Sequence, residues 1–192
     1  KFSGAARTEA TVILGTAIVR VRDNVGKLQT VRVLLDSGSQ ISAITLQCAT
    51  RLGLRQIKSR IEVTGLSQQR VTKVKGVTQC QFIPLHTEGP QFCATSVVIL
   101  THITMQLPGD RIPSAVRERY HHLLLADPEF DVPGPIDMLL GSDLYPHLLQ
   151  SKADIIHSTG LPSAMNTQLG WIVVGALNET STSPMVSLSA VS

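Results

Sequence analysis

One acidic residue at the end of an apolar strand constrains this 192-residue chain more than any other feature. Residues 31–35 (VRVLL) and 41–44 (ISAI) are aliphatic stretches on either side of Asp36-Ser37-Gly38. They predict a buried strand that ends in a sharp turn carrying a carboxylate. Asp, Ser and Gly are also common in ordinary turns, so the tripeptide alone favours a plain strand-turn-strand. The rest of the chain has to decide between the two interpretations.

Composition favours one compact, apolar domain. Hydrophobic residues make up 43% of the chain and charged residues 16%, which excludes general disorder. Aromatic residues are only 4%, so Val, Leu and Ile must supply most of the packing. The net charge of +3 is spread along the chain without a dense basic patch or interleaved aromatic residues. We therefore expect no direct nucleic-acid binding.

The cysteines and the apolar runs bear on location. Cys48, Cys80 and Cys93 are odd in number and have no CxxC spacing, which argues against a disulfide framework and against a zinc site. They predict a reducing compartment. No apolar run has the length of a membrane span and the N-terminus does not resemble a signal peptide, so we expect no membrane partner and a cytoplasmic location. The missing initiator Met suggests a domain cut from a longer polypeptide.

The periodicity predicts a mainly β chain with a few short helices. We expect a linker at residues 1–10, an ordered domain at 11–176 with an insertion at 101–136, and a disordered tail at 177–192. The expected strands lie at 11–21, 29–35, 77–85, 91–100, 136–140, 153–156 and 169–176, with a glycine-tipped hairpin at 61–77. The expected helices lie at 46–54, at 114–125 and, capped by Ser142 or Asp143, at the residues up to 149.

Three features stand in a fixed order: an apolar strand ending in Asp-Ser-Gly, a glycine-tipped hairpin, and an apolar strand ending in Leu-Leu-Gly. This order resembles the retropepsin-like aspartic proteases. The resemblance is closer to one branch, the protease segment of BEL/Pao-type LTR retrotransposon polyproteins, and it spans roughly residues 12–176. The motifs that carry it are LLDSGSQ (34–40), LLADPEFD (124–131), PIDMLLGSD (135–143) and NTQLGWI (166–172). Four separated motifs are far more specific than a tripeptide.

The resemblance implies a closed, homodimeric retropepsin-like β fold and a role for each matching residue. Asp36 would be catalytic, while Ser37, Gly38, Leu139, Leu140 and Gly141 would support the catalytic loop. Ser39 and Gln40 would bind substrate beside that loop. The flap over the substrate would comprise Val63, Thr64, Gly65, Leu66, Ser67 and Gln68. The partners would be a second copy of the chain and an extended peptide, the polyprotein that contains the domain, in the cytoplasm or within virus-like particles.

The chemistry of peptide hydrolysis independently fits a carboxylate pair. Hydrolysis by water needs a base to activate the water and an acid to protonate the leaving nitrogen. Two carboxylates about 3 Å apart cannot both ionise, so the pair supplies both roles without metal or cofactor. A second Asp-[Ser/Thr]-Gly is absent from the sequence, because HSTG (157–160) has Ser158 at the Asp position. The second carboxylate must then come from another copy across a two-fold axis.

The chain departs from the viral pattern in two places. Viral retropepsins commonly carry an Asp and an Arg that form a salt bridge at the positions of Gln40 and Ser142. Both halves are replaced here, which suggests a neutral contact in place of the salt bridge. The flap tip GLSQ (65–68) has one glycine where many viral flaps have several.

Other interpretations are weaker but remain distinct. His121 and His122 could suggest a metal, but adjacent helical residues point in different directions and lack a spaced third ligand. Asp137 and Asp143 flank the Leu-Leu-Gly strand, and Asp143 fits a helix cap or a partner for backbone amides better than a catalytic acid. The alternative function is a catalytically silent, retropepsin-like dimerisation or peptide-binding module. The intact Asp-Ser-Gly favours the enzyme.

Overall fold

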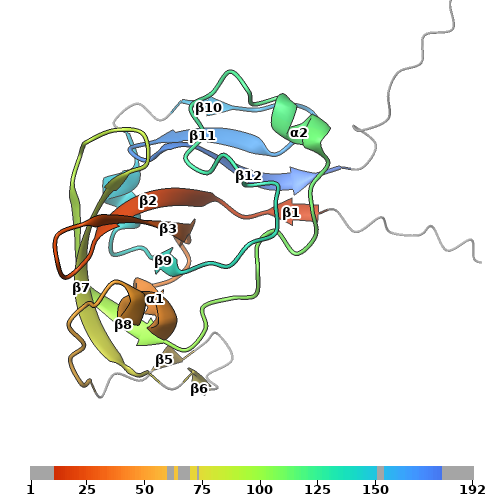
Figure 1. Ribbon diagram of the computed structural model, residues 1–192. Helices are drawn as coiled ribbons and strands as arrows, with labels where there is room; N and C mark the ends of the chain where they lie inside the picture. Colours follow the sequence, from red (N-terminus) through yellow and green to blue (C-terminus); the bar gives the residue numbers. More distant parts are fainter. Residues whose placement is uncertain (1–10, 60–62, 65–69, 73, 151–153, 179–192) are drawn as a thin grey trace, which may run out of the picture.

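A closed β-barrel is the main sheet of the computed structural model, which describes residues 11–59, 63–64, 70–72, 74–150 and 154–178 (Figure 1). Its strands follow the order β2-β3-β9-β4-β8-β7. Their bounds are β2 (Thr16–Arg22), β3 (Leu28–Leu35), β4 (Ala43–Thr45), β7 (Gly76–Pro84), β8 (Phe92–Leu100) and β9 (Met138–Leu140). The predicted fold class, mainly β with a closed barrel and a few short helices, is confirmed.

The barrel forms because its strands alternate between buried and more exposed side chains. β2 and β3 pair antiparallel with Val19 opposite Val31, and both residues are fully buried. β7 and β8 also pair antiparallel, and the rings of Phe82 and Phe92 stack 5.3 Å apart inside the barrel. The strands β3, β7 and β8 match the predicted strands 29–35, 77–85 and 91–100. The scarcity of aromatic residues leaves most of the core to aliphatic side chains.

A second sheet of strand order β1-β12-β11-β10 lies beside the barrel. Figure 1 shows α2 on the side of this sheet that is away from the barrel. Its strands are β1 (Thr11–Ile13), β10 (Ile155–Ile156), β11 (Ser163–Thr167) and β12 (Gly170–Leu177). The prediction of one strand over 11–21 is wrong, because the chain breaks at Leu14-Gly15 and β1 pairs with β12 while β2 pairs with β3. β11 was not predicted. Leu177 is buried in β12 and therefore belongs to the ordered domain, not to the predicted tail at 177–192. Residues 179–192 lie outside the described residues.

The helices are short. α1 (Leu46–Arg51) matches its prediction: the Thr45 hydroxyl accepts the Cys48 amide at its start, and Gly53 follows with a φ of +61°. α2 (Ser114–Glu118) is shorter than the predicted helix, because the end of the predicted range pairs with β12: the Leu124 carbonyl accepts the Trp171 amide, and Leu125 forms an isolated bridge with Trp171. α3 (Tyr145–Leu148) has no side-chain cap, so the prediction that Ser142 or Asp143 caps it is wrong.

The connection between β8 and β9, predicted as an insertion, builds a second core. Ile112, Val116 and Phe130 pack there against Ile13 of β1 and Val173 of β12. The connection thus covers one face of the second sheet. None of the described helices is long and apolar enough to cross a membrane.

Candidate active site

Asp36 is the first residue after β3, at the point where β9 lies between β3 and β4. β9 runs parallel to β3 and antiparallel to β4. The Asp36 amide continues the β3–β9 pairing by donating to the carbonyl of Leu140 at 3.0 Å. The loop from Asp36 to Ser42 therefore passes over the end of β9 on its way to β4. Residues about a hundred positions apart in the sequence meet at this loop.

The loop folds back on the Asp36 carboxylate. The Gly38 amide donates to Oδ1 of Asp36 at 2.9 Å, and the Ser39 amide donates to the Asp36 carbonyl at 3.2 Å. A Cβ on Gly38 would lie 3.2 Å from the same carboxylate oxygen, which is a tight contact. Asp36 is half-buried, whereas Ser37, Gly38 and Gln40 are exposed. The Gly38 amide thus holds one oxygen of the carboxylate, and the half-buried side chain keeps contact with solvent.

Gly141 lets the end of β9 approach this loop closely. A Cβ on Gly141 would lie 2.5 Å from the Ile41 carbonyl oxygen and 2.9 Å from that of Ser39, so no other residue fits without backbone movement. The next residue, Ser142, donates its amide to the Ser39 carbonyl at 2.7 Å. Leu140 is fully buried under the loop and Leu139 is half-buried. The structure therefore brings Leu139, Leu140 and Gly141 against the Asp36 loop.

Ser42 is a part of this site that sequence reasoning missed. Its side chain is fully buried, and its hydroxyl accepts the Gly141 amide at 3.0 Å while donating to Oδ1 of Asp143 at 2.8 Å. These contacts, with the Ser142 amide, join the Asp36 loop to the end of β9 through neutral groups. The one available sequence clue was a serine inside the aliphatic run 41–44.

Comparison with known proteins identifies the family. A family model described as aspartyl protease matches residues 18–144, which is most of the chain and includes Asp36 and Gly141. The chain belongs to the aspartyl protease family. No curated protein sequence matched it.

Two solved structures are similar to this aspartyl protease at low identity. One is the retroviral protease-like domain of Ddi1 from Leishmania major, with 15% identity, a TM-score of 0.32 and coverage of 89% of this chain and 98% of that chain. The other is a retropepsin-like aspartic protease from Rickettsia conorii, with 12% identity, a TM-score of 0.30 and coverage of 88% and 98%. The family assignment rests on the family model.

The predicted flap of this aspartyl protease is described in part. Val63 and Thr64 form β5 (Val63–Thr64), which pairs antiparallel with β6 (Arg70–Thr72). Figure 1 shows this hairpin at the end of the molecule away from the second sheet. The predicted tip residues Gly65, Leu66, Ser67 and Gln68 lie outside the described residues.

The other acids near the loop have partners within the chain. Asp137, just before β9, pairs through Oδ2 with Nη2 of Arg51 at 3.0 Å. Burial raises the pKa of Asp137, and the Arg51 guanidinium opposes that rise. Asp143 accepts from Ser42 as described. Asp137 and Asp143 are therefore both engaged by other groups of the same chain.

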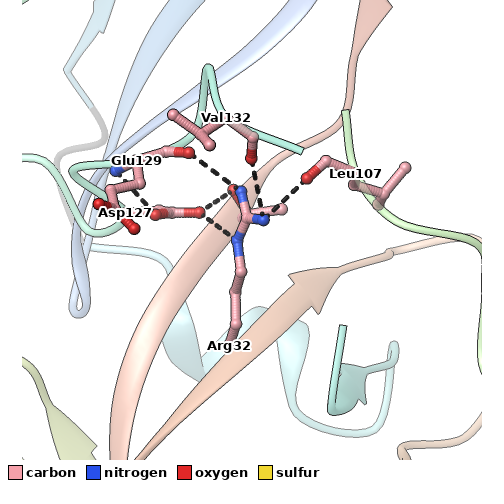
Figure 2. A network of polar contacts seen from close by, with 6 residues as sticks. Arg32, Leu107, Asp127, Glu129 and Val132 are labelled. Atoms are coloured by element: carbon pink, nitrogen blue, oxygen red, sulfur yellow. Dashed lines mark hydrogen bonds and ion pairs between the residues drawn. The ribbon is translucent and has the colours of Figure 1, made fainter. Parts of the chain in front are cut away.

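A buried ion pair fixes the connection between β8 and β9 to β3. Figure 2 shows Arg32 of β3 at its centre: Nε donates to Oδ2 of Asp127 at 2.7 Å and Nη1 donates to the Leu107 carbonyl at 2.7 Å. Asp127 also accepts the Thr16 hydroxyl at 2.6 Å and the Glu129 amide at 3.0 Å. The Asp127 side chain is 1% exposed. The motif 124–131 therefore serves the scaffold of the aspartyl protease rather than its chemistry.

Metal and nucleophile alternatives gain no geometric support. Among the described residues, no three His, Cys, Asp or Glu side chains are grouped to hold a metal ion. The His121 and His122 rings lie 5.6 Å apart, and Nδ1 of His121 lies 2.7 Å from the Glu118 carbonyl. Burial raises the pKa of Cys48 to about 11 and that of Cys80 to about 12, so both remain thiols at neutral pH.

Proposed function

We propose that this chain is a retropepsin-like aspartic endopeptidase that acts as a homodimer. The observation that carries the proposal is the setting of Asp36, a half-buried carboxylate at the end of a core strand, held from one side by the Gly38 amide and open on the other. A water molecule between two such carboxylates would be deprotonated by one of them and attack the peptide carbonyl. The other carboxyl group would donate its proton to the nitrogen of the departing amine.

The need for a second copy follows from the single Asp-[Ser/Thr]-Gly in the sequence. The neighbouring acids have other partners, since Asp137 is paired with Arg51 and Asp143 accepts a hydrogen bond from buried Ser42. One chain then supplies one carboxylate of the dyad. A two-fold axis brings identical residues face to face, so a dimer supplies the second Asp36.

The substrate we propose is an extended peptide. It would lie over the Asp36 loop, with Ser39 and Gln40 contacting it and the predicted flap, residues 63–68, closing over it. Ser37 would support the loop. The motifs 34–40, 124–131, 135–143 and 166–172 support a BEL/Pao-type LTR retrotransposon as the source. In that setting the protease would process the polyprotein that contains it, in the cytoplasm or inside virus-like particles.

Cleavage of a polyprotein fragment by the purified chain, compared with Asp36→Asn, tests this function. The exchange removes the ionisable group while keeping a side-chain oxygen that can accept the Gly38 amide. We expect cleavage to fall by about a thousandfold or more. Equal cleavage by both proteins, or none by either at mildly acidic and neutral pH, would reject the protease and favour the catalytically silent binding module.

Mixing the two proteins tests whether the dyad is shared between chains. In an equal mixture that exchanges subunits, about one quarter of the dimers carry two Asp36 residues, so the activity per wild-type chain should fall to about half. Activity per mole of the wild type should also fall on dilution. Activity strictly proportional to the wild-type concentration in both experiments would mean that one chain suffices.

A further inference from the structure

Asp143 is an exposed acid shortly after β9, and its hydrogen bond leads back into the Asp36 loop. Its Oδ1 accepts the hydroxyl of Ser42 at 2.8 Å, and the same hydroxyl oxygen accepts the Gly141 amide at 3.0 Å. The Gly141 N–H and the Leu140 carbonyl belong to one planar peptide group. That carbonyl accepts the Asp36 amide at 3.0 Å. A continuous chain of hydrogen bonds, with one peptide group inside it, thus connects the Asp143 carboxylate to the backbone of Asp36.

The direction of these hydrogen bonds depends on Asp143. Ser42 is fully buried, and its hydroxyl carries a single hydrogen, which it donates to the Asp143 carboxylate. With that hydrogen committed, the lone pairs of the hydroxyl oxygen remain to accept the Gly141 amide. The backbone of Ser42 is also fixed, because its carbonyl accepts the Val98 amide at 3.0 Å. The Asp143 carboxylate therefore sets the orientation in which the Ser42 hydroxyl receives the Gly141 amide.

Each hydrogen bond in this chain polarises the next one. A hydroxyl that donates to a carboxylate becomes a better acceptor, and a peptide N–H that is strongly accepted makes its own carbonyl a better acceptor. Both ends of the 140–141 peptide group are engaged, its N–H by Ser42 and its carbonyl by the Asp36 amide. The plane of this peptide group is therefore fixed, and with it the position of the Asp36 backbone.

We infer that Asp143 is a positioning residue for Asp36 and acts through Ser42 and the 140–141 peptide group. The inference rests on the proposed function, since position matters most for a carboxylate that must meet a second one about 3 Å away. A small displacement of a reacting group lowers the rate of the chemical step strongly. Loss of the acceptor at Asp143 should therefore lower kcat and leave KM nearly unchanged.

Asp143→Ala and Asp143→Asn in the full chain test the inference, with Asp110→Ala as the matched control. The Ala exchange removes the acceptor, while the Asn exchange keeps a side-chain oxygen that can accept the Ser42 hydroxyl. Asp110 is also exposed, and within the described residues its side chain accepts no hydrogen bond. We expect kcat to fall about tenfold in Asp143→Ala with KM within about twofold, and to stay within about threefold of the wild type in Asp143→Asn. Asp110→Ala should leave both constants unchanged.

Amide proton chemical shifts give a second measurement that does not depend on cleavage. Longer hydrogen bonds should move the amide protons of Gly141 and Asp36 upfield in Asp143→Ala, and Asp143→Asn should restore them. A wild-type kcat in Asp143→Ala, an equal loss in both Asp143 variants, or unmoved amide protons would overturn the positioning role and leave the protease intact. A wild-type protein that cleaves nothing would reject the proposed function instead, and the amide shifts would still decide whether Asp143 is coupled to the Asp36 backbone.

Discussion

Strand β3 and the residue that follows it carry two polar clusters four residues apart, and the clusters differ in how their carboxylates are partnered. At Arg32, both oxygens of Asp127 accept hydrogen bonds from the chain itself, from Arg32, Thr16 and the Glu129 amide, and the carboxylate is 1% exposed. At Asp36, the carboxylate is half-buried and Oδ1 accepts the Gly38 amide.

The difference separates a scaffold from a reactive site. A buried charge has to be paired and hydrogen-bonded, so the Asp127 cluster is complete in one chain and can do little except hold elements together. A carboxylate that is left partly open keeps the capacity to bind water, substrate or a second carboxylate. Exchanges in the first cluster should therefore change stability, and exchanges in the second should change activity.

The largest loss of stability is expected for Arg32→Met. It leaves Asp127 as a buried charge without its cation, and such losses are about 3–5 kcal/mol. Urea unfolding would measure the change in the free energy of unfolding. Arg22→Met is the control, because Arg22 is exposed and contacts the Gly26 carbonyl. Equal effects of the two exchanges would mean that the Arg32 cluster is no tighter than an ordinary surface contact.

Gly141→Ala should come next, at about 3 kcal/mol, because the new methyl group would overlap backbone atoms of Ile41 and Ser39. Those atoms belong to the Asp36 loop, so cleavage should fall as well. Gly109→Ala is the control, since nothing lies within 4 Å of the position of its Cβ. Thermal unfolding of both variants would show whether the loop can move aside, in which case the loss at Gly141 would be as small as at Gly109.

Ser42→Ala should lower the free energy of unfolding by about 1–3 kcal/mol, because it leaves the buried Gly141 amide without its acceptor. Ser39→Ala removes a local bond to the Ile41 carbonyl from a half-buried side chain and should cost less. Denaturant titration of the pair checks the order. A Ser42 variant as stable as the Ser39 variant would exclude a bracing role for the buried hydroxyl.

A smaller effect is expected from the pH dependence of Asp137. Burial raises its pKa in the folded state, so the neutral form favours folding. The resulting stability is fully present below the unfolded pKa, near 4, and is lost as pH rises through the raised folded value. Asp137→Asn should remove this part of the stability–pH curve. Arg51→Met should extend the decline to higher pH, because the guanidinium that opposes the rise is gone, and an unchanged curve would contradict the assignment.

Asp36→Asn should change the free energy of unfolding least, within about 0.5 kcal/mol, although it should abolish cleavage. The amide oxygen can still accept the Gly38 amide, and the side chain is half-buried. The free energy of unfolding would then differ strongly between this variant and Arg32→Met, although the two residues are only four positions apart. A large loss of stability at Asp36 would remove the distinction between the two clusters.

Local patterns predicted much of the barrel and of the Asp36 loop. Apolar and β-branched runs identified the hairpin of β2 and β3 and the positions of β7 and β8, and turn residues marked the loop after β3. Such runs do not say with which strand a residue pairs, so the break at Gly15 and the strand β11 were missed. The helix after Ser114 was overextended because helical spacing cannot reveal that Leu124 and Leu125 pair with Trp171.

The sequence by itself determined that a carboxylate stands at the end of an apolar strand, in a chain with one Asp-Ser-Gly, and that the chain is mainly β. These properties follow from neighbouring residues, whose periodicity and turn preferences act locally. The tertiary structure decided what surrounds the carboxylate. Ser42 and Gly141 are 99 positions apart and meet because β9 inserts between β3 and β4. Arg32 and Asp127 are 95 positions apart and meet because the connection before β9 folds back onto β3. Contacts of that range depend on how strands are ordered in the barrel, which local patterns do not encode.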